Sequence, residues 1–416
     1  MNNQTQPQVM DYDPFTPAVM QDPTPFYEYL RQEQPFYYLE KYDSYFLSRF
    51  ADIAEVLSYT DNTFMQTEGS LPTPAALRVH NHGQAPEVAG LDPFPISQRL
   101  GNPIHSQVRR AHIAPMMPAQ LKQLQNFILQ LTNERLDQLL PKGKFNLTRD
   151  FGGYVSSNTI MHLMGMPKEE AEFCLDLVNS GTTTDPELGG FDSAATAKKA
   201  IQHYLPYVQA RMDAGADGSV PMVDGLINFR LEGRALNAAE VAQNLVCAFI
   251  GGIESVPKVT AHGLMELANH PEQQVAVRSD LEKNTPKAVE EMLRYCAPAQ
   301  WFIRTVHKEV TINGQKMLPG QRVFLLNASA LRDDREYKDP YSFQWDRHIP
   351  RTLAFGQGMH FCIGAHLARL EIKTMVKTFL ERVPNYSFDM ANAERPASSF
   401  QIGWNTLPVI IGEGWH

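Results

Sequence analysis

The sequence lacks several patterns that would assign a function directly. Its four cysteines, Cys174, Cys247, Cys296 and Cys362, form no C-x-x-C or C-x-x-C-H spacing. The cysteine pattern therefore gives no support for a zinc, iron–sulfur or c-type heme site. The 416 residues also contain no glycine-rich dinucleotide fingerprint. If the protein carries out a redox reaction, its electrons must come from a separate partner.

Long apolar runs are also missing. No stretch approaches the ~18 uninterrupted apolar residues of a membrane-spanning helix, so no transmembrane segment is expected. The segment 1–20 is polar and contains proline, and it has no basic start followed by an apolar run, so it does not read as a signal peptide. The net charge of −9 argues against nucleic acid as a partner. Widely spaced cysteines in a long chain indicate reduced thiols and a cytoplasmic setting.

What is present fits an ordinary globular protein. Of the 416 residues, 43% are hydrophobic and 20% are charged, which is ample for a buried core. Length alone suggests two or three domains.

The most informative stretch is 355–364, FGQGMHFCIG. A helix is predicted from Ile363 to about Val383, which places Cys362 at a helix N-terminus. There, the helix dipole and unpaired N–H groups favour a thiolate. The alternative is an ordinary buried cysteine, the usual fate of a free cysteine.

This stretch resembles the heme-binding loop of the cytochrome P450 family, Phe-x-x-Gly-x-basic-x-Cys-x-Gly, and matches it at every fixed position. The resemblance implies heme b (iron protoporphyrin IX) as cofactor, with the Cys362 thiolate as the proximal iron ligand. It also implies that Phe355 and His360 lie beside the cofactor.

Two further stretches carry basic residues that resemble the family's propionate-binding positions. His105 and Arg109 lie at i and i+4, on one face of a helix predicted to start near Pro103. They resemble the family's His-Thr-x-x-Arg pattern, with Ser106 in place of threonine. Arg304 follows an apolar, strand-like run. The resemblance implies that these three bases reach the heme propionates; a solvated surface role is the alternative.

A long central helix is predicted to start near Asn237, where Asn237 and Glu240 have the spacing of a capping box, and to end before Pro271. About 33 residues at 1.5 Å each give a length of roughly 50 Å. Its apolar middle contains an acid and a hydroxyl, Glu254 and Ser255, which are costly to bury without a function.

The middle of this helix resembles the distal Gly-x-acid-alcohol signature of the family. The resemblance implies that Gly251 approaches the heme and that Glu254 and Ser255 deliver protons to bound dioxygen. Serine replaces the usual threonine and has a freer χ1 angle, and Pro257 is unusual because it removes a backbone donor. A structural kink with a water-filled defect is the alternative.

Large apolar residues are predicted to line the substrate pocket. These residues suggest a small apolar or aromatic substrate such as a terpenoid. The aromatic residues of the run 301–303 could equally be part of the hydrophobic core. The candidates are Val246, Ile250, Trp301, Phe302 and Phe400.

A helix is predicted to begin at Thr285-Pro286, a cap followed by proline. On it, Glu291 and Arg294 lie at i and i+3 and resemble the family's Glu-x-x-Arg pair. Arg347 fits the third residue that locks this pair. The role implied for all three is structural, holding the cysteine loop.

Two segments resemble the parts of the family that cover the substrate pocket. The proline-rich loop from Gln66 to Leu100 is too long for a simple connection, and the resemblance places it as a lid; an unengaged surface loop is the alternative. Helices predicted over 168–180 and 194–214, with the link 181–190, would form the roof.

The remaining pattern predicts short elements near the start of the chain and helices in the first half. Helices are expected over 25–34, 51–58, 120–140 and 151–165, strands over 36–39 and 45–48, and a hairpin turn at Asn313-Gly314.

The resemblance covers about 26–411 and implies a mainly α cytochrome P450 fold, a single heme-thiolate domain over 1–416 with a large helical part and a smaller β-rich lobe. The implied activity is monooxygenation of a small hydrophobic substrate with O₂ and electrons from a ferredoxin and its reductase. A peroxide-driven peroxygenase and a non-catalytic heme sensor or carrier are the alternatives. A basic patch for the ferredoxin is expected near the thiolate, from Arg109, Arg110, His112, Arg351, His360, Arg369 and Lys373.

Overall fold

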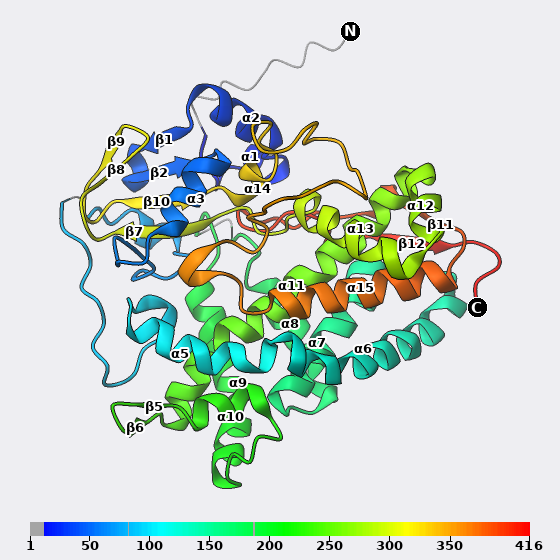
Figure 1. Ribbon diagram of the computed structural model, residues 1–416, viewed down its shortest axis with the longest axis horizontal. Coiled ribbons are helices and arrows are strands. Elements are labelled where there is room, and N and C mark those ends of the chain that lie inside the picture. Colours follow the sequence, from blue (N-terminus) through cyan, green and yellow to red (C-terminus); the bar gives the residue numbers. More distant parts are fainter. Residues whose placement is uncertain (1–11, 82, 186–187) are drawn as a thin grey trace.

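The computed structural model describes residues 12–81, 83–185 and 188–416. The predicted polar segment at the start of the chain, up to residue 11, and two residues of the predicted roof link, 186–187, lie outside them. A β-rich lobe and a larger helical part make up the molecule (Figure 1). This agrees with the predicted division.

The main sheet of the β lobe is built from segments far apart in sequence. Its strand order is β1-β2-β10-β7-β3. Strand β10 runs parallel to β2 and antiparallel to β7, so the C-terminal half of the chain is paired directly with the N-terminal quarter. The strands are β1 (Phe36–Leu39), β2 (Ser44–Leu47), β3 (Phe64–Met65), β7 (Phe302–Val306) and β10 (Arg322–Leu325).

Short helices and a hairpin complete this lobe: α1 (Pro17–Gln21), α2 (Thr24–Glu33), α3 (Phe50–Ser58), α4 (Pro74–Leu77), α14 (Asn327–Ala330), β8 (Val310–Ile312) and β9 (Gln315–Met317). The hairpin turn is at Asn313 and Gly314, with φ angles of 46° and 81°. Two positive φ angles in a two-residue turn match the right-handed twist of the flanking strands. The predictions for this turn and for the early helices and strands are therefore confirmed.

The helical part stacks long helices beside one another (Figure 1). It contains α5 (Ile104–Ile113), α6 (Pro118–Leu139), α7 (Tyr154–Met164), α8 (Ala171–Ser180), α9 (Ser193–Asp213), α10 (Pro221–Ile227), α11 (Ala238–Asn269), α12 (Pro271–Arg278), α13 (Leu281–Tyr295) and α15 (Ala365–Arg382). Two small sheets lie at its edges, one from β4 (Lys144–Asn146), β11 (Tyr386–Phe388) and β12 (Pro408–Ile411), and one from β5 (Arg230–Leu231) and β6 (Arg234–Ala235).

Helix α11 is the predicted central helix, and its start is the predicted capping box. The Glu240 N–H donates to Asn237 Oδ1 at 3.0 Å, and the Asn237 N–H donates to Glu240 Oε2 at 2.9 Å. Two backbone donors that a helix start leaves unpaired are thus satisfied reciprocally.

A π-helical turn, Leu147–Gly153, precedes α7 and replaces the start predicted for that helix. It packs against α11 at Pro257, which lies inside that helix. A Cβ on Gly152 would lie 2.8 Å from Pro257 Cα. Glycine therefore allows the two backbones to approach closely at the proline.

The predicted start of α13 is wrong. The helix begins at Leu281, after Asp280, whose side chain accepts a hydrogen bond from the Lys283 N–H at 3.1 Å. Pro286 lies inside the helix, in its second turn. One proline there removes only one N–H donor, and the earlier aspartate cap decides the boundary.

The predicted lid, 66–100, has little regular structure. Its first part is fixed to the β lobe by Arg322, which is fully buried and pairs with Glu68 at 2.7 Å. The same guanidinium donates to three carbonyls of this segment, those of Ala76, Leu77 and Val79.

The last part of this segment is fixed to α11. The Phe94 N–H donates to Glu240 Oε1 at 2.7 Å, and the Ser97 N–H donates to Asn244 Oδ1 at 2.8 Å. Between the two anchors, most of 83–92 is exposed. No helix in the described residues is long and apolar enough to cross a bilayer.

Candidate functional site

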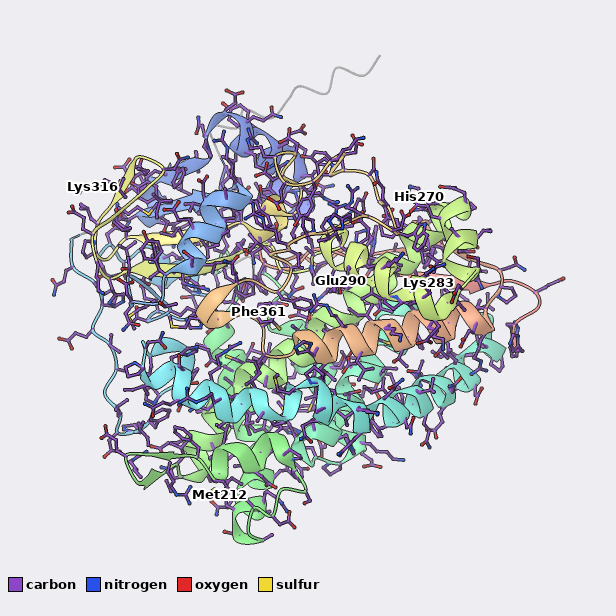
Figure 2. All side chains as sticks on the ribbon, viewed as in Figure 1. Met212, His270, Lys283, Glu290, Lys316 and Phe361 are labelled. Carbon is purple, nitrogen blue, oxygen red and sulfur yellow. The ribbon has the colours of Figure 1, made fainter. Side chains whose placement is uncertain are left out.

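The loop around Cys362 joins the two parts of the molecule. The Cys362 N–H donates to the carbonyl of Phe355 at 2.9 Å and closes the loop. Gly358 has a φ of 69°, and a Cβ there would lie 2.0 Å from the carbonyl oxygen of Leu57 on α3. Phe361, beside Cys362, lies where the β lobe meets the helices (Figure 2). The glycine thus lets the loop pass directly over the end of α3.

Cys362 lies just before α15, which starts at Ala365 with Gly364 as its N-cap. Burial raises the pKa of the Cys362 thiol, while the Gly364 N–H and the charges of Arg109 and Arg369 act to lower it. The predicted stabilisation of a thiolate by the helix start is present, but desolvation outweighs it. The side chain nevertheless carries accessible surface. Cys362 therefore faces an internal space.

One face of α11 also borders internal space. Cys247 and Gly251 are exposed and Ser255 is half-buried, although most of the helix around them is buried. These residues lie at i, i+4 and i+8, one above the other. Burial raises the pKa of Cys247 to about 11, so its surface does not face bulk water. The Ser255 hydroxyl donates to the Gly251 carbonyl at 3.3 Å.

Among the described residues, four basic side chains near the cysteine loop have no acidic partner. His105 is 2% exposed, and its ring nitrogens lie 3.0 Å from the Ser97 carbonyl and 3.1 Å from the Met359 carbonyl. The His105 and His360 ring centroids lie 4.4 Å apart, and the buried His360 Nε2 has no partner in the described part of the chain. Arg304 is 6% exposed and donates to the Ile303 carbonyl, and burial lowers its pKa to about 10. The fourth, Arg109, donates to the Phe361 carbonyl.

Burial lowers the pKa of His105 and of His360, so the cations of this set are Arg109 and Arg304, and a cation without a counter-charge is costly to bury. An anionic ligand would satisfy them, and two carboxylates on one flat molecule would suit a set that lies on α5, β7 and the cysteine loop. The donor set therefore fits a porphyrin with propionates.

The Glu254 carboxylate has partners of its own. Lys258 donates to Oε1 at 3.0 Å, Gln401 donates to Oε2 at 3.1 Å, and the Thr182 hydroxyl also donates to Oε1. Glu254 and Lys258 are 4% and 2% exposed. Consecutive side chains on a helix point about 100° apart, so the Glu254 carboxylate is directed to a different side of α11 from the Ser255 hydroxyl.

The predicted pocket residues differ in exposure. Ile250 and Phe302 are half-buried, whereas Val246 and Phe400 are 3% and 5% exposed. Trp301 has no accessible surface; it packs against Phe324 and Phe400 and donates to the Ser399 carbonyl at 2.8 Å. The structure gives its predicted contact with substrate no support, because its indole is enclosed by the β lobe.

The predicted structural triad is assembled. Glu291 and Arg294 are fully buried and are joined by two bonds of 2.7 Å. Arg347 reaches the same carboxylate at 3.1 Å. Arg294 also donates to the carbonyls of Leu331 and Pro340. These contacts tie α13 to the segment that leads into the cysteine loop.

The predicted basic patch is weaker than expected. Three of its seven members form ion pairs: Arg351 with Glu336, Arg369 with Glu290, and Lys373 with Glu282. His112 is buried, at 5% exposed. Acidic side chains from neighbouring segments thus cancel much of the charge that the sequence alone assigned to this face.

A match to the family model described as cytochrome P450 covers residues 188–409, more than half of the chain. The chain belongs to the cytochrome P450 family. The vitamin D3 dihydroxylase of Streptomyces griseolus is 30% identical over 77% of this chain and 76% of its own. The methyl-branched lipid omega-hydroxylase of Mycobacterium tuberculosis is 27% identical over 78% and 76%.

The same fold is found in a solved cytochrome P450 from Chondromyces apiculatus, with a TM-score of 0.81 and 24% identity over 98% of this chain and 100% of that one. The family match and the hydroxylase relatives show that the protein is an oxidoreductase of the P450 monooxygenase family, whose members hold heme iron. The predicted mainly α fold is confirmed.

Sequence reasoning missed the partners of Glu254. Thr182 and Gln401 lie far from it in sequence and carry no periodic signal. Lys258 was detectable, because it stands four residues after Glu254 and such a spacing favours an ion pair on a helix.

Proposed function

We propose that this P450 hydroxylates a hydrophobic small molecule, using O₂ and two electrons delivered by a ferredoxin and its reductase. The observation that carries the proposal is the group of four basic side chains beside the glycine-rich cysteine loop, none of which has an acidic partner among the described residues. The shared sheets, which pair strands from both ends of the chain, support one heme-thiolate domain over 1–416.

Heme b would be held from two sides. Cys362 Sγ is the proposed iron ligand, and Gly251 on α11 would leave room for the heme because, apart from the backbone of α11 itself, no atom of the described residues lies within 4 Å of a Cβ built there. When bound, the heme supplies dioxygen activation.

Four basic side chains would hold the propionates: His105, Arg109, Arg304 and His360. His105 and Arg304 are buried, Arg109 and His360 are half-buried, and none of the four pairs with a carboxylate of the described residues. Phe355 would pack beside the heme through the loop that its own carbonyl closes.

Ser255 and Glu254 would control protons. The Ser255 hydroxyl lies on the face of α11 that borders internal space and can hold a water there. Glu254 would replenish the proton after its carboxylate turns from Lys258. Because three donors restrain that carboxylate, its release is expected to be slower than the motion of the hydroxyl.

The substrate class rests on two observations. Relatives include enzymes named for vitamin D3 and for methyl-branched lipids, and the predicted pocket is lined by apolar side chains. Ile250, Phe302 and the cavity face of Cys247 are the half-buried or exposed candidates for contact. We therefore place the substrate among lipophilic, mostly hydrocarbon molecules.

The ferrous–CO spectrum tests the proposal. Heme-loaded protein should show the red-shifted Soret band of a thiolate ligand, and Cys362→Ser should lose it. Cys174→Ser, Cys247→Ser and Cys296→Ser are matched controls that should keep it. Retention of the band in Cys362→Ser refutes the ligand. Turnover of lipophilic compounds with a surrogate ferredoxin then tests the reaction. Product that forms only when peroxide is added would support a peroxygenase, and no product under either condition would support a sensor.

A further inference from the structure

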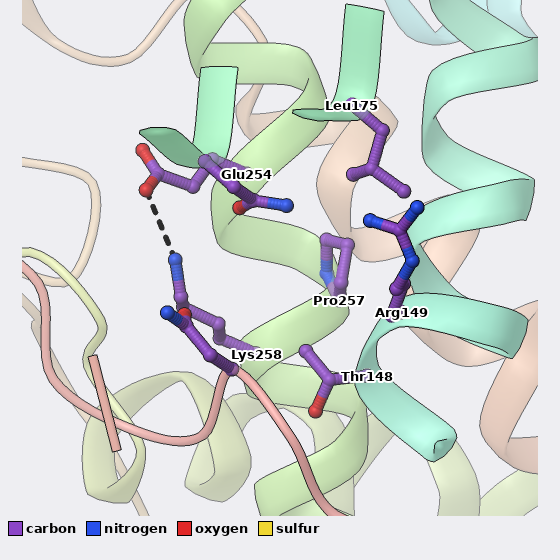
Figure 3. Close-up of a pocket in the computed structure, with 8 residues that line it drawn as sticks. Thr148, Arg149, Leu175, Glu254, Pro257 and Lys258 are labelled. Atoms are coloured by element: carbon purple, nitrogen blue, oxygen red, sulfur yellow. Dashed lines mark hydrogen bonds and ion pairs between the residues drawn. The ribbon is translucent and has the colours of Figure 1, made fainter. Parts of the chain in front are cut away.

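A small cavity of ≈20 Å³ lies beside the buried pair of Glu254 and Lys258 and has no role in the function described above. Four segments meet at it: the π-helical turn, α8, α11 and the segment before β12. Its lining residues are Thr148, Arg149, Leu175, Asn179, Glu254, Pro257, Lys258 and Asn405. Lys258 points to the Glu254 carboxylate, and Pro257 and Arg149 lie to one side of the pair (Figure 3).

The cavity is bordered by polar groups with unused hydrogen-bonding capacity. The Lys258 ammonium has three N–H donors, but its one hydrogen bond in the described part of the chain is to Glu254 Oε1 at 3.0 Å. Thr148 is 6% exposed, and its hydroxyl oxygen is buried without a partner. Asn179 and Asn405 add two half-buried amides.

Pro257 adds an acceptor at the same level of α11. Proline has no N–H, so the carbonyl of Ile253 lacks its usual helical donor there. A site for one water needs about 10–15 Å³ and two to four polar partners. The cavity meets both conditions.

The outer end of the cavity reaches the surface at Arg149. This side chain is 38% exposed and forms ion pairs with Glu172 and Asp176 on α8. These carboxylates are 83% and 54% exposed, so the surface beside the cavity is in contact with water. The cavity thus lies between the water-exposed surface at Arg149 and the Glu254 carboxylate.

We propose that a water bound in this cavity, held by Lys258 and Thr148, supplies protons from solvent to Glu254. The inference deepens the proposed function, because it rests on Glu254 as the proton source for Ser255. For each proton that Glu254 passes on, the cavity water gives one proton to Glu254 and takes one from bulk water. Only O–H bonds break and form, no electron moves, and Lys258 and Arg149 keep their protons. Lys258 and Thr148 are positioning residues, because they hold the water and the carboxylate.

Thr148→Val tests the route, because valine has nearly the shape of threonine but no hydroxyl. Crystal structures of the heme-loaded wild type and variant should show an ordered water within hydrogen-bond distance of Lys258 in the first and none in the second. Product formation should fall about tenfold in the variant, less than the ~10²-fold expected on removing a general acid. KM should be unchanged, and the solvent isotope effect on turnover should rise.

Thr148→Ser keeps the hydroxyl and should restore both the water and the yield of product per reduced cofactor. Thr311→Val makes the same chemical change at an exposed site on β8, in the β lobe, and should have no effect. If Thr148→Val does not fold, Asn179→Leu removes a half-buried partner of the same cavity.

A dry cavity in the wild type, or wild-type yield in a variant that has lost the water, overturns the inference. If the wild type binds heme but hydroxylates nothing, the proposed function is refuted instead. In that case the electron density beside Lys258 still shows whether the cavity holds a water.

Discussion

Glu371 makes the stability of this protein depend on pH. It lies on α15 with 1% of its surface exposed. The Ser156 hydroxyl donates to Oε2 at 2.9 Å, and Oε1 has no partner. Burial raises the pKa of Glu371 from 4.5 to about 8, against the smaller lowering effect of hydrogen bonds from Ser156 and Thr159.

The folded protein therefore holds this proton more tightly than the unfolded chain does. Between pH 4.5 and 8, unfolding releases the proton, so the free energy of unfolding falls as pH rises. The two pKa values differ by 8 − 4.5 = 3.5. At 1.36 kcal/mol for each pH unit, the stability present below pH 4.5 and lost above pH 8 is ~5 kcal/mol.

Glu371→Gln should remove this dependence, because glutamine stays neutral and can still accept the Ser156 hydroxyl. Urea unfolding of both proteins from pH 5 to 9 measures the difference. The variant should match the wild type near pH 5 and be more stable by several kcal/mol near pH 9. Glu381→Gln, a half-exposed acid on the same helix, is the control. A difference between Glu371→Gln and wild type that stays constant with pH would contradict the reasoning.

Three other perturbations have distinct outcomes. Arg294→Lys should cost about 3–5 kcal/mol in urea unfolding, because the guanidinium donates to both Glu291 oxygens and to three carbonyls, whereas an ammonium group has three donors on one atom. Arg369→Lys, in a half-exposed pair, should cost less than about 1 kcal/mol, and equal losses would contradict the buried triad. Trp301→Phe should lower the free energy of unfolding by about 1 kcal/mol, because the hydrogen bond to the Ser399 carbonyl is lost. It should leave the range of accepted substrates unchanged, whereas Phe302→Ala should alter that range. A changed range in Trp301→Phe would show that the indole lines the pocket. The rate of electron transfer from a limiting ferredoxin should fall less than about tenfold between 0.01 and 0.15 M salt, where the screening length falls from ~30 to ~8 Å. A hundredfold fall would show that the full basic patch attracts the ferredoxin despite its ion pairs.

The parts of the fold with local signals were predictable. The capping box at Asn237 and the turn at Asn313-Gly314 depend on residues within a few positions of each other, and both are present. The start of α13 was missed for a local reason: Thr285-Pro286 resembles a cap, but Asp280 caps five residues earlier.

The site was predictable where a motif fixes the spacing and not where contacts are long-range. The spacing of Glu291 and Arg294 predicted their ion pair, and the position of Arg347 between this pair and the cysteine loop predicted it as the third member. Nothing in the sequence shows that Thr182 and Gln401 converge on Glu254, because tertiary packing alone brings them together. The burial of Trp301 depends on the whole β lobe in the same way.

The two anchors of segment 66–100 have a consequence for engineering. Arg322 holds the residues up to Val79, and Glu240 and Asn244 hold those from Phe94 onward. Between them, Gln84 passes close to Gly320 and Asp92 pairs with Arg234 at 3.3 Å, so the stretch 85–91 is the part without such an anchor among the described residues. Loop closure costs only about 0.6 kcal/mol for each doubling of length. The stretch 85–91 can therefore be exchanged for segments of other lengths and compositions without disturbing the cysteine loop or α11, which makes it the place to test whether the predicted lid controls substrate choice.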